Sequence, residues 1–581
     1  MKHWMLVLAV MMLAAAPARA QSDVNALRGM WMADLDFGPA ARGGLTLIRD
    51  GETWRADLAG ERVRFDSGGD TVTFALPSGA SFRGRLTRRG EIEGFWLQAA
   101  GETGRQAMAT PLTLVRSGSD AWRGEVVPLD ERVRIFLRVD GEPAQAAFHL
   151  PELNYRGGAA RFAIEREGDA VAFTAGEGED ATRIDARFAD GRLHMTWPDF
   201  GMEVAFARAT AEQAADFTAR PPDEAPYRYG RPPETRDGWR TARARSVGFD
   251  EAALEALVRR LSQADSAAAN ANLVHSILAA RRGRLVLEHY FFGFDRDTPH
   301  DTRSAGKTFS SVMLGALMRE GAQISPNTRV YDAMADWGPF GNADPRKAEI
   351  TLAQLMTHSS GLACDDNDWD SPGNEGVMQS QSEQSNWPLY TLNLPMEHDP
   401  GAHYAYCSGG INLAGAVLSQ ASGEWLPALF HRTIAEPLSF GRYYWNLMPD
   451  GEGYLGGGAH ILPRDLLKLG QLYLDGGVWR GRRIVSRDWV QDSTAAHIAF
   501  SAPVDFFTGA DGYAWHRYPV RMGDREIEAY EANGNGGQVL LVVPEYDLVV
   551  VFTGGNYRQG GVWGRWRDDI VGGAIIPALR D

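Results

Sequence analysis

A proline- and arginine-rich segment, residues 216–247, divides the chain into two halves whose apolar residues follow different periods. Before it, from about Leu27 to Ala207, short segments alternate apolar and polar residues and end in glycine or aspartate turns. A period of two broken by hairpin turns is typical of antiparallel β structure. We therefore expect an all-β domain over residues 21–215, folded as a barrel or a sandwich, with 216–247 as an extended linker.

The all-β region contains two features that indicate a duplication. The segment LRGMWMADL at 27–35 is echoed by DAWRGEVVPL at 120–129, and each copy is followed by strands that end near a tryptophan, Trp96 or Trp197. Its histidines, His149 and His194, are isolated in the sequence, so we expect no catalytic centre in this half.

After the linker, helical and strand patterns are mixed. Asp250 and the leucines at 254, 257 and 261 mark a helix, and apolar runs at 538–543 and 548–552, joined by a turn, indicate a buried hairpin. We expect residues 248–581 to form an α+β domain, with an antiparallel sheet flanked by helices and a helical subdomain.

Charge and targeting signals limit the location and partners of the chain. Its net charge of −16 over 581 residues argues against a nucleic-acid or anionic-membrane partner, since both require basic surfaces. Lys2, an apolar run from Trp4 to Ala16 and the small residues around Arg19 form a secretory signal peptide with cleavage near Ala20. We expect an exported protein, periplasmic or secreted, without a membrane span in its mature part; the oligomeric state stays open.

Ser304 and Lys307 are the strongest candidates for chemistry. They stand three residues apart at the start of an apolar helix, so the hydroxyl and the amine share one face. Only four of the 59 Lys and Arg residues are lysine. Because arginine cannot give up its proton at working pH, a scarce lysine beside a serine suggests a general base with a lowered pKa. The alternative is a solvated lysine at a helix N-terminus.

Three separated motifs resemble those of the serine β-lactamase and penicillin-binding-protein superfamily. They are Ser304-x-x-Lys307, Tyr406-Cys407-Ser408 and Asn535-Gly536-Gly537, in that order. Over about residues 246–581 the chain is most similar to the class C branch, with its esterase, D-aminopeptidase and nylon-oligomer-hydrolase relatives. The resemblance implies an acyl-enzyme on Ser304, Lys307 as base and Tyr406, partly phenolate, as proton relay. It also implies an oxyanion hole made by the backbone N–H groups of Ser304 and Gln538, with Ser408 and Asn535–Gly537 binding substrate.

Two departures from the family pattern bear on the substrate. Asn535 stands where the family usually has a lysine or histidine, and Ser408 where it usually has asparagine. Both favour an ester or small amide over a β-lactam. The alternatives are a D-Ala-D-Ala or D-amino-acid peptidase acting on cell-wall fragments, and a non-hydrolytic penicillin-binding or sensor protein.

No metal or organic cofactor is expected. The acidic loop at 366–370 begins like a calcium loop but lacks its glycine and its final glutamate, so we expect a solvated loop near the mouth of a site. Cys364 and Cys407 are the two cysteines of the chain, and in an oxidising compartment such a pair can form a disulfide; two buried thiols are the alternative.

Overall fold

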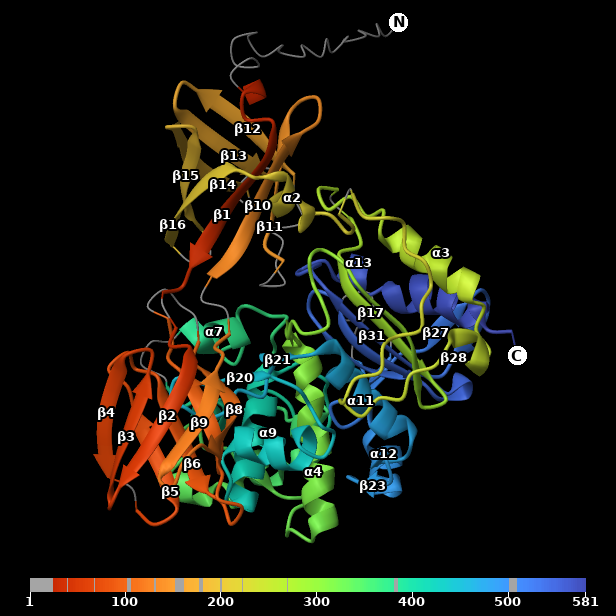
Figure 1. The fold of residues 1–581 in the computed structure, drawn as a ribbon. Coiled ribbons are helices and arrows are strands. Elements are labelled where there is room, and N and C mark those ends of the chain that lie inside the picture. The colour runs from red at the N-terminus through yellow and green to blue at the C-terminus, as the bar shows by residue number, and fades with distance from the viewer. Residues whose placement is uncertain are drawn as a thin grey trace, which may run out of the picture.

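The computed structural model describes residues 24–580 except 39, 67, 102–105, 130–131, 152–160, 177–180, 199–200, 222, 269, 381–384 and 501–508. The proposed signal peptide lies outside the described residues. Two β bodies precede an α+β half that contains the C-terminus (Figure 1). The predicted α+β class and the antiparallel β structure before it are confirmed. Among the described residues, no helix has the length and apolar character that crossing a membrane requires.

The first β body contains strands β2–β9, which pair in the order β4-β3-β2-β9-β8-β7-β6-β5. Its core holds three buried tryptophans, Trp54, Trp96 and Trp122. The strands are β2 (Gly43–Asp50), β3 (Thr53–Leu58), β4 (Glu61–Asp66), β5 (Thr71–Ala75), β6 (Ser81–Leu86), β7 (Ile92–Gln98), β8 (Met108–Arg116) and β9 (Ala121–Val126).

The second β body is a closed antiparallel barrel whose interior is filled by apolar side chains, Trp31 and Trp197 among them. Because the barrel is closed, each of its strands pairs with a neighbour on both sides and none is left as an edge. Its strands are β1 (Gly29–Asp36), β10 (Arg132–Asp140), β11 (Gln145–His149), β12 (Phe162–Glu167), β13 (Ala170–Ala175), β14 (Thr182–Ala189), β15 (Arg192–Trp197) and β16 (Met202–Arg208).

Strand pairing in the two β bodies does not follow chain order. β1, which precedes β2 in the chain, pairs with β10 and β16, whereas β9, which precedes β10, pairs with β2. The echoed tryptophans Trp31 and Trp122 therefore lie on equivalent strands, and Trp96 and Trp197 lie on the seventh strand of each body. We propose that the bodies are duplicated units with swapped first strands.

The α+β half is built on an antiparallel sheet with apolar residues on both faces. Leu540 and Val542 on β30 pack against α4 and α11, whereas Leu541 and Val543 pack against α3 and η8. The sheet order is β18-β17-β31-β30-β29-β26-β25-β24. The strands are β17 (Val274–Arg281), β18 (Arg284–Tyr290), β24 (Ile498–Ala499), β25 (Ala510–Asp511), β26 (His516–Arg517), β29 (Tyr530–Gly534), β30 (Gln538–Val543) and β31 (Leu548–Gly554). The helices that pack on the two faces of this sheet are α3 (Glu251–Leu261), α4 (Phe309–Glu320), α11 (Pro463–Leu474) and η8 (Arg567–Ile575).

A shared sheet joins the first β body to the α+β half. β8 pairs with β20 (Tyr444–Asn446), β20 with β21 (Ala459–Ile461), and β21 with β19 (His300–Asp301). Figure 1 shows β8, β20 and β21 next to one another, beside the helical subdomain that contains α9 (Ser408–Ser422). β19 ends three residues before Ser304, so the first β body is connected to the strand that leads into the candidate nucleophile.

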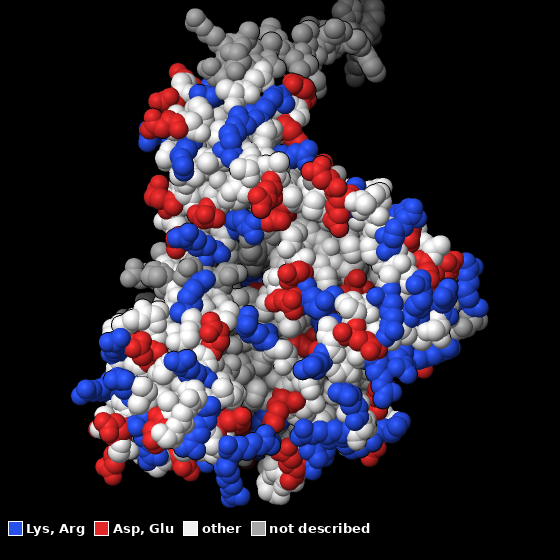
Figure 2. Space-filling model, viewed as in Figure 1, with Lys and Arg blue, Asp and Glu red and all other residues white. Residues whose placement is uncertain are grey.

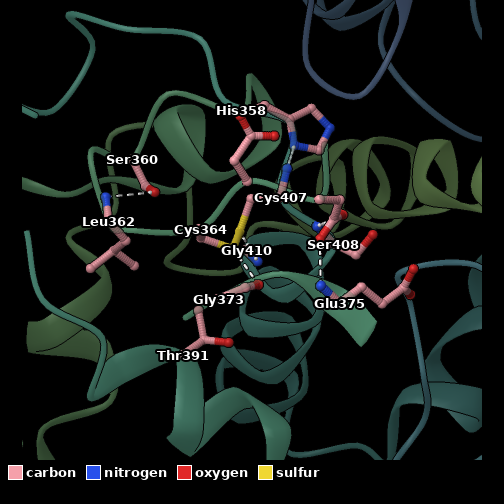
Figure 3. Close-up of a disulfide and its surroundings, with 12 residues drawn as sticks. His358, Ser360, Leu362, Cys364, Gly373, Glu375, Thr391, Cys407, Ser408 and Gly410 are labelled. Carbon is pink, nitrogen blue, oxygen red and sulfur yellow. Dashed lines mark hydrogen bonds between the residues drawn. A yellow bond between two sulfur atoms is a disulfide. The ribbon is translucent and has the colours of Figure 1, made fainter. Parts of the chain in front are cut away.

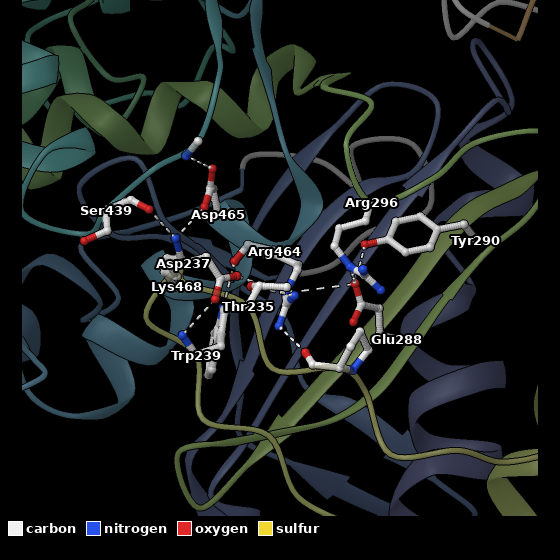
Figure 4. Close-up of polar contacts among 12 residues, drawn as sticks. Thr235, Asp237, Trp239, Glu288, Tyr290, Arg296, Ser439, Arg464, Asp465 and Lys468 are labelled. Carbon is white, nitrogen blue, oxygen red and sulfur yellow. Dashed lines mark hydrogen bonds and ion pairs between the residues drawn. The ribbon is translucent and has the colours of Figure 1, made fainter.

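The linker lies along the α+β half and is held there by Arg464 at the start of α11. The guanidinium of Arg464, whose side chain is 3% exposed, forms an ion pair of 3.0 Å with Asp237 and donates to the Thr235 hydroxyl at 3.1 Å (Figure 4). The backbone carbonyl of the same arginine accepts from the Trp239 indole at 2.9 Å. One turn further along α11, Lys468 is buried against Asp465 at 2.6 Å (Figure 4).

Candidate functional site

Ser304 and Lys307 lie in direct hydrogen-bonding contact. Both belong to a 3-10 helix, η3 (Arg303–Thr308), that precedes α4; residues three apart eclipse each other in this geometry. Lys307 Nζ donates to Ser304 Oγ at 3.0 Å and also to the Gly456 carbonyl. Lys307 is 4% exposed, so it is not a solvated lysine. Ser304 lines a cavity of about 540 Å³.

The lysines at 307, 347 and 468 are all buried, so the scarcity of lysine does not by itself identify a catalytic residue. Lys347 and Lys468 are also buried, at 5% and 0% exposure, and neither lines the cavity that contains Ser304. Each binds backbone carbonyls: Lys347 those of Gly341 and Leu392, and Lys468 that of Ser439. The contact with Ser304 is what distinguishes Lys307.

Tyr406 completes a cluster with these two residues. Its chain segment runs into α9, and Lys307 Nζ lies 4.9 Å from the centroid of its ring. Burial raises the pKa of Tyr406, although Lys307 and hydrogen bonds from Ser304 and Lys307 act to lower it. Burial thus opposes the partial phenolate that the resemblance implied, and the charge of Lys307 favours it.

Tyr406 and two carboxylates from a segment distant in sequence act together on the protonation of Lys307. Burial acts to lower the pKa of Lys307, but interactions with Tyr406, Glu375 and Asp366 outweigh it and raise the pKa. A lysine held between negative charges keeps its proton. The free site thus carries an ammonium ion, in contrast to the lowered pKa expected for a general base.

Asp366 and Glu375 were not recognised as site residues from the sequence. One carboxylate oxygen of Asp366 accepts from the Ser408 N–H at 2.8 Å and the other accepts from the Glu375 N–H at 2.7 Å (Figure 3). Burial, followed by the charge of Asp366, raises the pKa of Glu375 to about 7. The acidic loop was the available signal: we expected it to be a solvated loop near the mouth of a site, and Asp366 and Asn367 line the cavity. No group of three or more metal-ligating side chains occurs in the described part of the chain.

A disulfide fastens this loop to the second motif. Cys364 and Cys407 are joined by an S–S bond of 1.97 Å, with their Cα atoms 5.4 Å apart (Figure 3). Cys407 lies between Tyr406 and Ser408, so the bond holds the Asp366 loop beside both. Ser408 is 1% exposed and lines the cavity.

The third motif approaches Ser304 through the end of β29 rather than through the following turn. A Cβ atom placed on Gly534 would lie 3.0 Å from the Ser304 backbone nitrogen, so the two segments touch. Asn533 and Asn535 line the cavity. The remaining predicted residues do not line it: Gly536 forms a bridge with Asn556, Gly537 packs against Trp566, and the Gln538 side chain binds both backbone groups of Gly554.

A histidine from a neighbouring strand lines the same cavity. His516 on β26 lines it, and its Nδ1 lies 2.5 Å from the carboxylate of buried Asp511 on β25. Burial acts to lower the pKa of His516, but the Asp511 carboxylate outweighs it and raises the pKa. Burial also raises the pKa of Asp511, and protonated His516 would carry a positive charge into a cavity where Asn535 carries none. Nothing in the sequence marks this pair, because strand pairing brings it to the site.

The walls of the cavity come from both halves of the chain. The first β body and its neighbouring connections contribute Phe37, Gln106, Met108 and Leu129. The face drawn in Figure 2 carries acidic and basic side chains intermixed over both halves.

Comparison with known proteins gives a match to one family model and to several relatives. The family model described as Beta-lactamase matches residues 254–558. The 6-aminohexanoate-dimer hydrolase of Paenarthrobacter ureafaciens is 24% identical over 289 residues, which cover 48% of this chain and 71% of that protein.

Two solved structures also match. A penicillin-binding protein homologue from Caulobacter crescentus is 17% identical, with a TM-score of 0.44; the match covers 56% of this chain and 97% of the homologue. A family VIII carboxylesterase is 17% identical, with a TM-score of 0.42, and covers 53% of this chain and 93% of its own.

Proposed function

We propose that this chain, which belongs to the Beta-lactamase family, hydrolyses esters or small amides through an acyl-enzyme on Ser304. The family and its hydrolase relative make the protein a serine hydrolase. The observation that supports the assignment of residues is the contact of 3.0 Å between Lys307 Nζ and Ser304 Oγ in a cavity that Tyr406 also lines.

In the proposed reaction, Ser304 Oγ attacks the carbonyl carbon of the substrate while its proton passes to Lys307 Nζ. Because the pKa of Lys307 is raised in the free site, its ammonium group must first give one proton to solvent, and the amine so formed accepts the proton of Ser304. Substrate displaces water and so makes the charged form costlier, which lowers the lysine pKa. When the tetrahedral intermediate collapses, the bond to the leaving group breaks and Tyr406 passes the proton to it. Water then reverses these steps and releases the acid.

The negative oxygen of the intermediate needs backbone donors. We assign one to the Ser304 N–H and, in place of Gln538, the second to the N–H of Asn535. Asn535 lines the cavity and follows Gly534, which touches the backbone at Ser304. Removing such a donor typically costs about 3 kcal/mol of transition-state stabilisation.

His516 supports a second class of substrate. A D-amino-acid peptidase must hold the carboxylate of its peptide, and the absence of a cation at Asn535 argued against this role. The imidazolium of His516, held by Asp511 at 2.5 Å, can meet that carboxylate instead. Release of D-alanine from a muropeptide by purified protein would favour this substrate over a simple ester.

Hydrolysis of p-nitrophenyl butyrate tests the proposal. Ser304→Ala should reduce the rate to background, and Ser119→Ala, at an exposed serine of the first β body, should leave it unchanged. Lys307→Arg keeps the charge but removes the base, so we expect a loss of at least about 10²-fold. Lys347→Arg, at a buried lysine outside the cavity, is the matched control. Full activity in Ser304→Ala would refute the nucleophile.

A fluorophosphonate label separates the enzyme from a non-hydrolytic binding protein. An active serine hydrolase should be labelled at Ser304 and should turn over an ester. Labelling without turnover would indicate a sensor or binding role. We also propose that the protein is exported; the first residue of the mature protein, expected to be Gln21, can be read by N-terminal sequencing.

A further inference from the structure

Three apolar side chains from outside the α+β half line the cavity that contains Ser304. Phe37 follows β1, Met108 begins β8 and Leu129 follows β9. They are 5%, 5% and 8% exposed, so their remaining accessible surface is small. Nothing in the catalytic steps above uses them.

Met108 and Leu129 are held in place by the joint between the two halves. In the shared sheet Met108 is the register partner of Asn446, which also lines the cavity. The side chain of Gln98 donates to the Leu129 carbonyl at 3.1 Å and accepts from its N–H at 2.9 Å. Met108 and Leu129 pack together around Tyr444 of β20. Their position relative to Ser304 is therefore set by paired backbone rather than by mobile side chains.

We propose that Phe37, Met108 and Leu129 form an apolar subsite that binds the hydrocarbon part of the substrate. A polar group of the substrate would find no hydrogen-bond partner on these three apolar side chains. A methylene group moved there from water is favoured by about 0.8 kcal/mol. The first β body thus selects the substrate that the α+β half cleaves. This inference rests on the proposed function, which places the scissile bond at Ser304.

The hydrocarbon can belong to the acyl group or to the alcohol, and two substrate series separate these sources. One series is p-nitrophenyl acetate, butyrate and hexanoate; the other is the ethyl, butyl and hexyl esters of acetic acid. The wild-type protein should favour longer chains in one series. Met108→Ala and Leu129→Ala should each reduce the hexyl-to-ethyl or hexanoate-to-acetate ratio of kcat/KM by about tenfold.

Controls distinguish selectivity from loss of folding. Val115→Ala lies on the same strand, β8, at a side chain with 52% exposure outside the cavity, and should leave the ratio unchanged. Met108→Leu keeps a large apolar side chain at this position, so it should have the wild-type ratio of kcat/KM values. A partly unfolded variant loses activity towards the short and the long substrate by the same factor, so its ratio of kcat/KM values stays that of the wild type. Ratios unchanged from wild type in both series, in folded Met108→Ala and Leu129→Ala, would overturn the subsite.

A binding measurement keeps the subsite separate from the proposed function. If no ester is cleaved, or if Ser304→Ala remains active, the proposed function fails. Calorimetric titration of Ser304→Ala protein with acetate, hexanoate, ethanol and 1-hexanol then tests the subsite alone. Tighter binding of a six-carbon ligand that is lost in Ser304→Ala/Met108→Ala supports it, and equal binding of short and long chains refutes it.

Discussion

Gly534 is where the structure allows the sharpest test of how β29 supports the nucleophile. A Cβ atom on this residue would lie 2.4 Å from the Thr302 carbonyl oxygen, 2.9 Å from Arg303 Cβ and 3.0 Å from the Ser304 nitrogen. Two of these atoms are backbone atoms, which cannot rotate away. Gly534→Ala must therefore move β29 and η3 apart.

The required displacement can be read from the contact distance. Ordinary van der Waals contact begins at 3.4 Å, so the contact with Thr302 is short by about 1 Å. A misplacement of about 1 Å in a catalytic constellation can cost about 10²-fold in rate, which corresponds to about 2.7 kcal/mol of transition-state stabilisation. We expect this loss in kcat/KM, because the Ser304 and Asn535 N–H groups would no longer meet one oxygen atom.

The assay is steady-state hydrolysis of p-nitrophenyl butyrate, accompanied by thermal unfolding to show that the variant is folded. Gly230→Ala is the matched control, because a Cβ atom there meets nothing within 4 Å. It should retain the wild-type kcat/KM. A folded Gly534→Ala protein whose kcat/KM is within twofold of wild type would refute the role assigned to β29.

Three further perturbations test the surroundings of the nucleophile. Replacing both Cys364 and Cys407 by serine opens a loop whose ends are 43 residues apart, which should lower the free energy of unfolding of the α+β half by about 4 kcal/mol; an unchanged urea midpoint would contradict this. Asp511→Asn removes the charge that raises the pKa of His516, so the alkaline limb of the kcat/KM–pH profile should move to lower pH, and a profile identical to wild type would argue against the imidazolium. Glu375 has a pKa raised to about 7 from 4.5, so the folded state binds the extra proton and the wild type should lose stability, at most about 3 kcal/mol, as pH rises through this window. Glu375→Gln should flatten this slope in melting temperature against pH, and an equally steep slope in the variant would rule Glu375 out as its source.

Much of the fold follows from local periodicity. The alternating segments before residue 208 and the apolar runs at 538–552 predict strands because side chains alternate across a sheet every second residue. The contact between Ser304 and Lys307 is local in the same sense, since a spacing of three residues brings the side chains together in any helix. The sequence by itself determined these features.

Contacts between distant segments were decided only by the tertiary structure. The pairing of β1 with β10, of β9 with β2 and of β8 with β20 joins segments that no periodicity relates. For the same reason the sequence could not show that Tyr406, Glu375 and Asp366 raise the pKa of Lys307, or that His516 lines the same cavity as Asn535. Charge–charge interactions depend on distance through space and on burial, and both quantities come into existence only when the chain has packed.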